Sequence, residues 1–427
     1  METEIQKQSI IEGKTYIDFK AIPTRYYDSY KLYEIEYEEE GQVKTKEVGL
    51  RINTPFYKEL YTYEDWQTIE IGTYQNYRLM NDIDFANRED IKTEVTIGRL
   101  EAEGEPKKLK NIKIAIDKSE TGLIKNVRNS MKNITFENIE ITSSTSSTIQ
   151  NIGVIGTTTG TYENIEFSNI KIQAENANRL GCIGSISYGE INNITLKDIE
   201  IEGKNYVGSF IGYTSMTTIT NITANDITII GTNYIGGIFG YKLYEGTTST
   251  TLIGKITADN ITVTGTSYVG GILGYGVGHD ITLTNSNITG QTRVGGILGS
   301  YDNCWNTQDL IDISVQKTTI QGSKEYIGGI AGYLNSVSSR LQNTEIVECN
   351  IIGTTVNSNY VGGIIGGTNS RIYNTNVRDS LISSQGSYVG GIIGTMIGTM
   401  SDSNYYMYYN FIQNTTIEGY SKIGGIA

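Results

Sequence analysis

The sequence has few of the residues on which metal and disulfide chemistry depend. Its 427 residues include one histidine, His279, and three cysteines, Cys182, Cys304 and Cys349, which lie far apart. A single histidine excludes any zinc site built on two histidines, including the HExxH motif of metallopeptidases. Because the cysteine count is odd and no CxxC occurs, we expect buried free thiols, no metal site and no cofactor.

Long apolar runs and an excess of positive charge are also missing. No run of 18 apolar residues exists, and the formal net charge is −13. We therefore expect neither membrane insertion nor nucleic-acid binding. The first residues, METEIQKQSIIEG, lack the apolar segment of a signal peptide. Only 3 prolines accompany 49 glycines and 31 tyrosines, a composition that disfavours a disordered or helical chain and favours an all-β one.

Charge divides the chain into a conventional module and a repetitive region. Residues 1–120 hold 25 acidic and 18 basic side chains, whereas the 307 residues of 121–427 hold only 22 and 16. Residues 1–75 are predicted to form a small β-rich module, and 76–120 a lead-in that caps the repeats. Thr15–Pro23, Tyr30–Glu38 and Val43–Asn53 alternate as half-buried strands do, with a turn at Glu40-Gly41. The module's tyrosines fit either ordinary packing or a carbohydrate-binding face: Tyr26, Tyr27, Tyr30, Tyr33 and Tyr37.

A repeated Gly-Gly element dominates residues 121–427. Its clearest copies are Tyr234–Gly240 (YIGGIFG), Tyr268–Gly274 (YVGGILG), Arg293–Gly299 (RVGGILG), Tyr326–Gly332 (YIGGIAG), Tyr360–Gly366 (YVGGIIG) and Tyr388–Gly394 (YVGGIIG). Tyr206–Gly212, Arg179–Ser185 and Lys422–Ala427 are weaker copies. A second element, such as Asn133–Ile141 (NITFENIEI) or Asn221–Ile229 (NITANDITI), precedes each copy and is typical of two short strands with a corner between them.

These repeats predict a right-handed parallel β-helix, or β-solenoid, of about ten coils over residues 121–427. Each unit supplies three short strands, two from the second element and one from the Gly-Gly element. One unit cannot bury its apolar face alone, but stacked units can. The chain stops inside a repeat, so we expect the parent protein to continue and this end to have open strand edges.

Asn or Asp recurs at the predicted corner, which needs a left-handed backbone. The positions are Asn138, Asn169, Asp198, Asp226, Asn260 and Asn287. Both residue types tolerate that conformation and can bond along the stack. A calcium site is the alternative, but adjacent units offer mostly one oxygen ligand each.

The residue before each Val/Ile of the Gly-Gly element is a tyrosine or a base. Repeated buried cations would be very costly, so we expect this column to lie at least partly at the surface. It could stack against sugars or a protein partner, or simply cover the β face. The candidate ligand-facing ladder is Tyr206, Tyr234, Tyr268, Arg293, Tyr326, Tyr360 and Tyr388. The two apolar columns that flank Gly-Gly, for example Ile235 and Ile238, can both face the core only if the glycines bend the strand.

At these motifs the sequence resembles the GLUG-motif repeats of bacterial cell-surface proteins, with Thr121-Gly122-Leu123-Ile124 as a degenerate first copy. Tyr77–Phe85 (YRLMNDIDF), Thr96-Ile97-Gly98 and Lys110-Asn111-Ile112 resemble the lead-in that precedes such repeats. A similar arrangement occurs in the N-terminal, non-catalytic region of immunoglobulin-A-cleaving zinc metalloendopeptidases. The resemblance covers about residues 75–427. It implies an extracellular or cell-surface location, further domains in a longer parent chain, and a host glycan or protein as partner.

No catalytic residues are predicted. Asp302, Asp309 and Asp312 form one loose acidic cluster, in an insertion that also holds Cys304 and Trp305, and His279 is expected in a loop. A polysaccharide lyase or hydrolase would need converging carboxylates or a carboxylate–calcium site. We therefore expect a non-enzymatic scaffold that acts as a stalk or adhesion module. The alternatives are the non-catalytic region of a secreted zinc metalloendopeptidase and a β-helix polysaccharide lyase or hydrolase.

Overall fold

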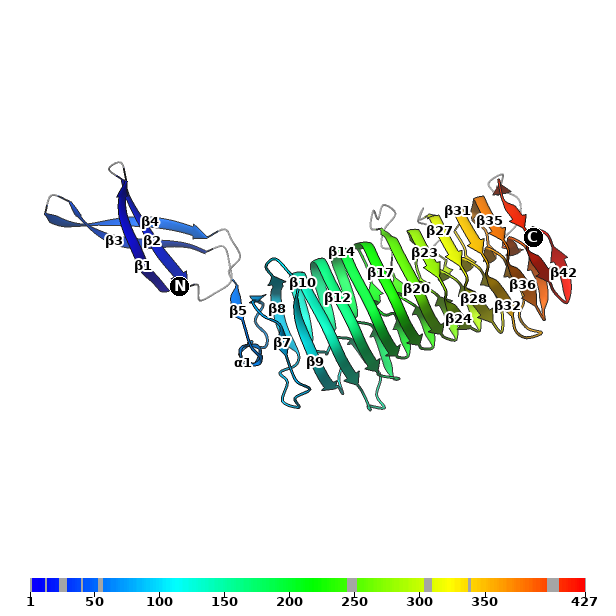
Figure 1. The fold of residues 1–427 in the computed structure, drawn as a ribbon, viewed down its shortest axis with the longest axis horizontal. Helices are drawn as coiled ribbons and strands as arrows, with labels where there is room; N and C mark the ends of the chain where they lie inside the picture. Colours follow the sequence, from blue (N-terminus) through cyan, green and yellow to red (C-terminus); the bar gives the residue numbers. More distant parts are fainter. Residues whose placement is uncertain are drawn as a thin grey trace.

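The computed structural model describes residues 2–11, 14–22, 29–39, 41–52, 57–243, 252–302, 309–336, 339–397 and 407–426. Its regular structure is almost entirely β (Figure 1). The one helix among these residues, α1 (Tyr63–Gln67), is five residues long. No helix in the described ranges is long and apolar enough to cross a membrane. The all-β prediction is confirmed.

Two antiparallel hairpins come first in the chain. β1 (Glu2–Ile11) pairs with β2 (Lys14–Ile22), and β3 (Ser29–Glu39) pairs with β4 (Gln42–Ile52). Glu39 pairs with Gln42, and Gly41 between them has a φ of +77°. Glu40, the other residue of the predicted turn, lies outside the described residues. The tyrosines Tyr26 and Tyr27 lie outside the described residues.

The remaining strands build a parallel β-solenoid, which confirms the predicted fold class. The large sheet contains β5 (Lys58–Leu60), β6 (Gln75–Leu79), β7 (Ile83–Asp84), β8 (Val95–Ala102), β9 (Lys107–Ala115), β10 (Ile124–Thr142), β12 (Ile155–Gln173), β14 (Ile183–Glu202), β16 (Ile211–Thr214), β17 (Thr217–Ile230), β19 (Phe239–Lys242), β20 (Ile253–Thr264), β22 (Leu273–Tyr275), β23 (His279–Thr284), β24 (Asn287–Gly290), β26 (Leu298–Tyr301), β27 (Leu310–Gln316), β28 (Thr319–Gly322), β30 (Ala331–Leu334), β31 (Arg340–Val347), β32 (Asn350–Gly353), β34 (Ile365–Thr368), β35 (Arg371–Arg378), β36 (Leu381–Ser384), β38 (Ile393–Met396), β39 (Met407–Tyr408), β40 (Phe411–Gln413) and β41 (Thr416–Glu418).

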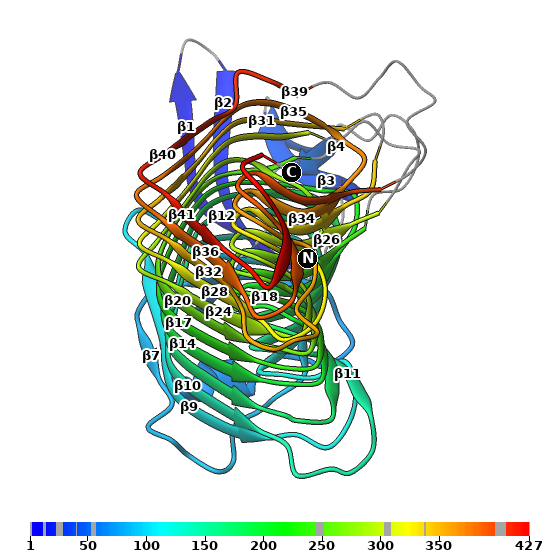
Figure 2. The ribbon, with the colours of Figure 1, turned by 90° about the vertical axis from the view of Figure 1, so that its right-hand side faces the viewer.

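A second, ten-stranded parallel sheet forms the other wall of the coils. It contains β11 (Ile149–Ile152), β13 (Ala177–Leu180), β15 (Asn205–Val207), β18 (Asn233–Gly236), β21 (Ser267–Gly270), β25 (Thr292–Gly295), β29 (Ile327–Gly328), β33 (Val361–Gly362), β37 (Ser387–Gly390) and β42 (Ser421–Gly424). The view along the stack shows successive coils lying over one another (Figure 2). Equivalent residues therefore form columns that run the length of the solenoid.

The Gly-Gly element supplies two strands to each coil, so the expectation of one was wrong. β18 ends at Gly236, the chain bends at the next residue, and β19 starts in the other sheet at Phe239. A Cβ built on Gly237 would overlap the carbonyl oxygen of Gly271 in the next coil. Because the glycine lets the chain turn there, Ile235 and Ile238 are both fully buried, as the bend predicted.

The core is a set of apolar columns, one residue per coil. Ile222, Ala224, Ile227 and Ile229 of β17 point inward and pair in register with Ile256, Ala258, Ile261 and Val263 of β20. Phe136 and Phe167 stack in the core, with ring centres 5.0 Å apart and planes 8° from parallel. Each coil alone would expose this surface, so burial by its neighbours stabilises the stack.

The predicted corners adopt the left-handed conformation at five of six positions. Their φ values lie between 52° and 58° at Asn138, Asn169, Asp198, Asp226 and Asn260. Asn169 donates from Nδ2 to Oδ1 of Asn138 at 2.7 Å, and Asn260 donates to Asp226 at 2.6 Å. These bonds confirm the predicted ladder along the stack.

The sixth corner was placed wrongly. Asn285 (φ 50°) makes the turn, and Asn287 is the first residue of strand β24. Ser286 replaces the isoleucine that follows the corner in earlier coils, and its hydroxyl accepts a bond from the N–H of Ile261 at 3.0 Å. Ile288 instead stacks on Val263.

The parallel sheet starts at β5, within the stretch 1–75. β5 pairs in parallel with β6, and α1 follows it. Thr62 and Asp65 cap α1 reciprocally, and Trp66 of this helix is fully buried against Phe85. Short amphipathic elements of this kind cover a solenoid's terminal coil, which otherwise exposes its core.

Candidate functional site

The tyrosine ladder (Tyr206, Tyr234, Tyr268, Arg293, Tyr326, Tyr360 and Tyr388) lies at the start of successive strands of the ten-stranded sheet. All seven residues are half-buried and have φ between 57° and 64°. The rings of Tyr234 and Tyr268 stack with centres 4.4 Å apart, and those of Tyr206 and Tyr234 with centres 5.0 Å apart. Because the side chain of every coil starts from the same backbone conformation, the rings align along the solenoid.

A second row of tyrosines packs against the first, and the sequence analysis missed it. Tyr213, Tyr241 and Tyr275 stack in register on strands β16, β19 and β22, with 5.5 Å and 4.6 Å between successive ring centres. Rings of the two rows meet edge to face, as between Tyr234 and Tyr241 at 5.2 Å and 80°. The signal was available, because a tyrosine follows the last glycine of these copies.

This packing reduces the ring surface and the reactivity of the hydroxyls that the tyrosine ladder presents to a ligand. Burial raises the pKa of Tyr241 to about 12 and raises those of Tyr234 and Tyr275 further. These three hydroxyls therefore stay protonated near neutral pH. The edge-to-face contacts give the two rows a structural role of their own.

Between Tyr206 and Tyr388, one coil lacks a tyrosine in both rows, and a cation fills the space. Arg293 and Ser300 stand at the two positions. The guanidinium carbon of Arg293 lies 4.9 Å from the ring centre of Tyr268 and 4.2 Å from that of Tyr333. Arg293 also donates to Oδ2 of Asp302 at 3.2 Å, while Tyr275 donates to the other oxygen at 2.7 Å. The partly buried charge is thus paired and stacked.

The loose acidic cluster of the sequence does not act as one site. Asp302 accepts bonds from Arg293 and Tyr275, Asp309 accepts two from the guanidinium and one from the backbone N–H of Arg340, and Asp312 accepts one from Asn343. Each carboxylate therefore has its own partner on a different column. Cys304 and Trp305 lie outside the described residues. Within the ranges that the structure describes, no three His, Cys, Asp or Glu side chains could hold a metal ion.

His279 and the two described cysteines have structural surroundings. His279 is not in a loop as expected but begins β23, where stacking on Gly254 fixes its backbone, and its Nδ1 lies 2.8 Å from Oδ2 of Asp280. Cys182 and Cys349 are buried free thiols, in agreement with the expectation. Burial raises the pKa of Cys349 to about 11 and that of Cys182 well above its ordinary value, so neither is a reactive thiolate.

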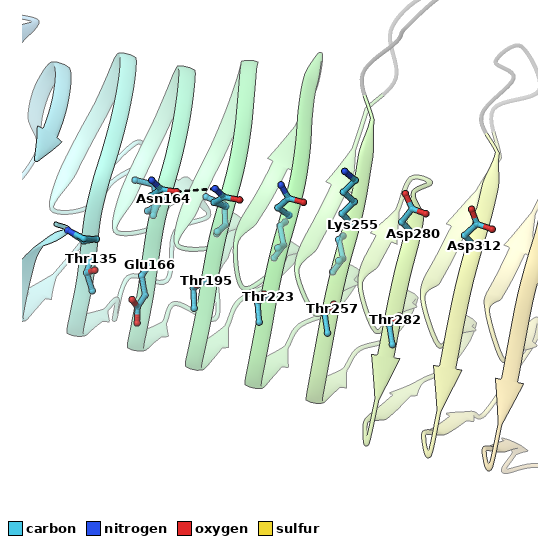
Figure 3. A pocket seen from close by; sticks show the side chains of 17 residues that line it. Thr135, Asn164, Glu166, Thr195, Thr223, Lys255, Thr257, Asp280, Thr282 and Asp312 are labelled. Carbon is cyan, nitrogen blue, oxygen red and sulfur yellow. Dashed lines mark hydrogen bonds between the residues drawn. The ribbon is translucent and has the colours of Figure 1, made fainter. Parts of the chain in front are cut away.

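The polar groove is a second surface, which the sequence analysis did not predict. It follows a bend in the long strands and has a volume of about 820 Å³. Two rows of side chains cross strands β10 to β27 along it (Figure 3). The bend row is Asn164, Asn193, Asn221, Lys255, Asp280 and Asp312. The hydroxyl row is Thr135, Thr195, Thr223, Thr257 and Thr282, with Glu166 at the position between the first two.

The bend row creates the groove because all six of its residues have left-handed φ, between 53° and 58°. A strand turns at such a residue, so the outward side chain two positions later faces the same hollow. The available signal was a second polar position five residues before each corner, as with Asn221 and Asp226. None of the groove's lining residues is aromatic.

Comparisons with known proteins give little beyond this geometry. Neither a protein-family model nor a curated protein sequence matches the chain. Among solved structures, the chain is similar to a candidate immunoglobulin A1 protease from Bacteroides ovatus, at 15% sequence identity and a TM-score of 0.28. The match covers 87% of this chain and 84% of that one.

Proposed function

We propose that this chain is a non-catalytic solenoid scaffold of a secreted or cell-surface bacterial protein, one that presents a ligand-binding surface. The observation that carries the proposal is the uninterrupted parallel stack from β5 to β42, in which side chains of one chemistry repeat from coil to coil. Such a surface suits contacts spread along a length, whereas catalysis needs different groups that converge on one bond.

The state of the described acids and bases supports a non-catalytic role. Asp302, Asp309 and Asp312 are each engaged separately. Burial raises the pKa of the Tyr234, Tyr241 and Tyr275 hydroxyls. The resemblance to GLUG-motif repeats supports the extracellular location and the adhesion role. The lead-in motif supports a second candidate function. In it, the chain is the non-catalytic region of a zinc metalloendopeptidase, and the peptidase site would lie elsewhere in the parent protein.

Activity assays test the proposal directly. The purified chain is incubated with a panel of neutral and acidic polysaccharides and with immunoglobulin A, and new reducing ends, unsaturated products and peptide fragments are measured. We expect none above the level of a heat-denatured sample. Cleavage of any polysaccharide that is abolished by Asp302→Ala or Asp312→Ala would overturn the non-catalytic role.

A further inference from the structure

We propose that the polar groove binds a neutral, extended polysaccharide that lies parallel to the solenoid axis. This inference rests on the proposed function and names the class of ligand that the scaffold presents. The groove crosses strands of successive coils at a constant lateral position, so its binding groups repeat along one direction (Figure 3).

The repeat distance favours a sugar chain over a peptide. Neighbouring strands lie about 4.8 Å apart, whereas an extended peptide advances about 3.3 Å per residue. A peptide along the axis would therefore lose register with the coils after one or two residues. One sugar of an extended β-linked polysaccharide advances by nearly the strand spacing, so successive sugars fall on successive coils. Because neighbouring sugars of a two-fold chain are rotated by half a turn, every second coil meets the same face.

The hydroxyl row offers unused hydrogen-bonding capacity. Among the described residues, the hydroxyls of Thr195, Thr223, Thr257 and Thr282 have no partner, and these side chains are exposed or half-buried. Thr135 lines the same groove with only 5% of its surface exposed and likewise has no described partner for its hydroxyl. A hydroxyl both donates and accepts, as sugar hydroxyls do, so a row of them complements a chain of sugars.

Hydrogen bonds between neighbouring side chains of the bend row are interrupted near the middle of the row. Asn193 donates to Asn164 at 3.1 Å, as expected for a ladder that satisfies itself. Asn221 instead donates to Asn192, outside the bend row, at 2.6 Å. The ladder is therefore interrupted beside Lys255, an exposed side chain for which no partner is found among the described residues. The amide oxygens of Asn193 and Asn221, for which no partner is found among the described residues, and the ammonium of Lys255 remain available to a ligand at this point.

The charges in the groove select against acidic polysaccharides. Glu166, Asp280 and Asp312 line it together with one cation, Lys255, and the chain as a whole carries −13. A uronate or sulfate at every sugar would meet Glu166 toward one end of the groove and Asp280 and Asp312 toward the other, and be repelled there. Threonine and asparagine side chains meet neutral sugars without that penalty.

The experiment is affinity electrophoresis and calorimetry of the full chain with soluble neutral β-linked glucans, xylans and mannans, and with polygalacturonate and hyaluronan as acidic probes. The groove variant Thr195→Val, Thr223→Val, Thr257→Val removes three hydroxyls and keeps side-chain shape and strand preference. The matched control Thr228→Val, Thr262→Val, Thr264→Val makes the same change at outward positions of strands β17 and β20 that lie outside the groove.

We expect at least one neutral glucan, xylan or mannan to bind, with affinity that rises with chain length. The groove variant should weaken binding by about tenfold or more, from the loss of three hydrogen bonds, and the control by less than about twofold. The acidic probes should bind more weakly than the neutral ones. Circular dichroism and the melting temperature establish that both variants fold.

Three results would overturn the inference: no binding of any neutral probe, equal loss in the groove and control variants, or tighter binding of the acidic probes. None of these results would contradict the proposed non-catalytic role. That role fails on a separate readout, the release of reducing ends or unsaturated products from a bound polysaccharide.

Discussion

The guanidinium carbon of Arg293 lies 4.2 Å from the ring centre of Tyr333, which belongs to the next coil of the solenoid. On its other side the same group lies 4.9 Å from the ring of Tyr268 in the preceding coil. A single cation therefore bridges two aromatic rows across the coil that lacks a tyrosine in each.

Replacing Arg293 tests whether this bridge stabilises the stack. Arg293→Ala removes two cation–π contacts and leaves the partly exposed Asp302 without its cation, so we expect a loss of about 2 kcal/mol in the free energy of unfolding. Arg293→Lys should recover less than half, because an ammonium lacks the planar face that stacks on both rings. Denaturant unfolding measures both. Lys324→Ala, an exposed cation nearby, serves as the control, and an equal loss there would contradict the bridge.

The glycine column at the bend gives a second prediction. A Cβ on Gly237 would overlap the carbonyl oxygen of Gly271, and both atoms belong to backbone that cannot move independently. Gly237→Ala should therefore lower the free energy of unfolding by about 3 kcal/mol or more, because the added methyl group overpacks the bend and strains it. Gly425 occupies the same column in the last described coil and has open space around its Cβ position. Gly425→Ala should change stability by no more than about 0.5 kcal/mol. Comparable losses in the two variants would argue against this account of the bend.

The corner amides should stabilise the stack in two separable ways. Asn169 combines a left-handed φ of 52° with a 2.7 Å bond to Asn138. Asn169→Ala loses both the conformational preference and the bond, at an expected cost of about 2 kcal/mol. Asn169→Gly loses only the bond, so we expect about half that cost. Thermal unfolding of the two variants measures the difference, and a glycine variant less stable than the alanine variant would contradict the assignment.

Buried Lys242 makes stability depend on pH. Its Nζ donates to the carbonyl oxygen of Thr217 at 2.7 Å, and burial lowers the pKa of the ammonium from 10.5 to about 7. Between these values the unfolded chain holds a proton that the folded chain does not, so the contribution of Lys242 to stability rises with pH. It is fully present above the unfolded pKa and lost below pH 7.

Lys242→Met isolates this effect from other titrations. As the pH rises from 7 to 9, the free energy of unfolding of the wild-type protein should increase by about 2 kcal/mol relative to that of the variant. Each pH unit contributes at most about 1.4 kcal/mol. The difference between the two unfolding free energies, measured at several pH values, tests it. A difference that stays constant over this range would show that Lys242 does not change its protonation on folding.

The repeating features of the fold could be predicted from the sequence. Features that depend on how deeply a side chain is buried, or on how neighbouring coils align, were missed. Periodic Ile and Gly-Gly columns determine a parallel stack because only stacking buries them. Asn287 was mistaken for a corner because Ser286 replaces an isoleucine, and the pattern alone cannot show that its hydroxyl bonds Ile261. The groove was missed because the left-handed bend at residues such as Lys255 is imposed by neighbouring coils, and lysine has no intrinsic preference for it.

The most direct test of the stack is pulsed electron paramagnetic resonance on spin-label pairs in one outward column. Glu140 and its equivalents Thr319, Asn350 and Leu381 follow one another through strict register pairing. From a label at Glu140, distances to labels at the other three should rise in equal steps of about 4.8 Å, near 29, 34 and 38 Å. Steps that are unequal, or distances that do not increase along the series, would contradict a continuous parallel solenoid.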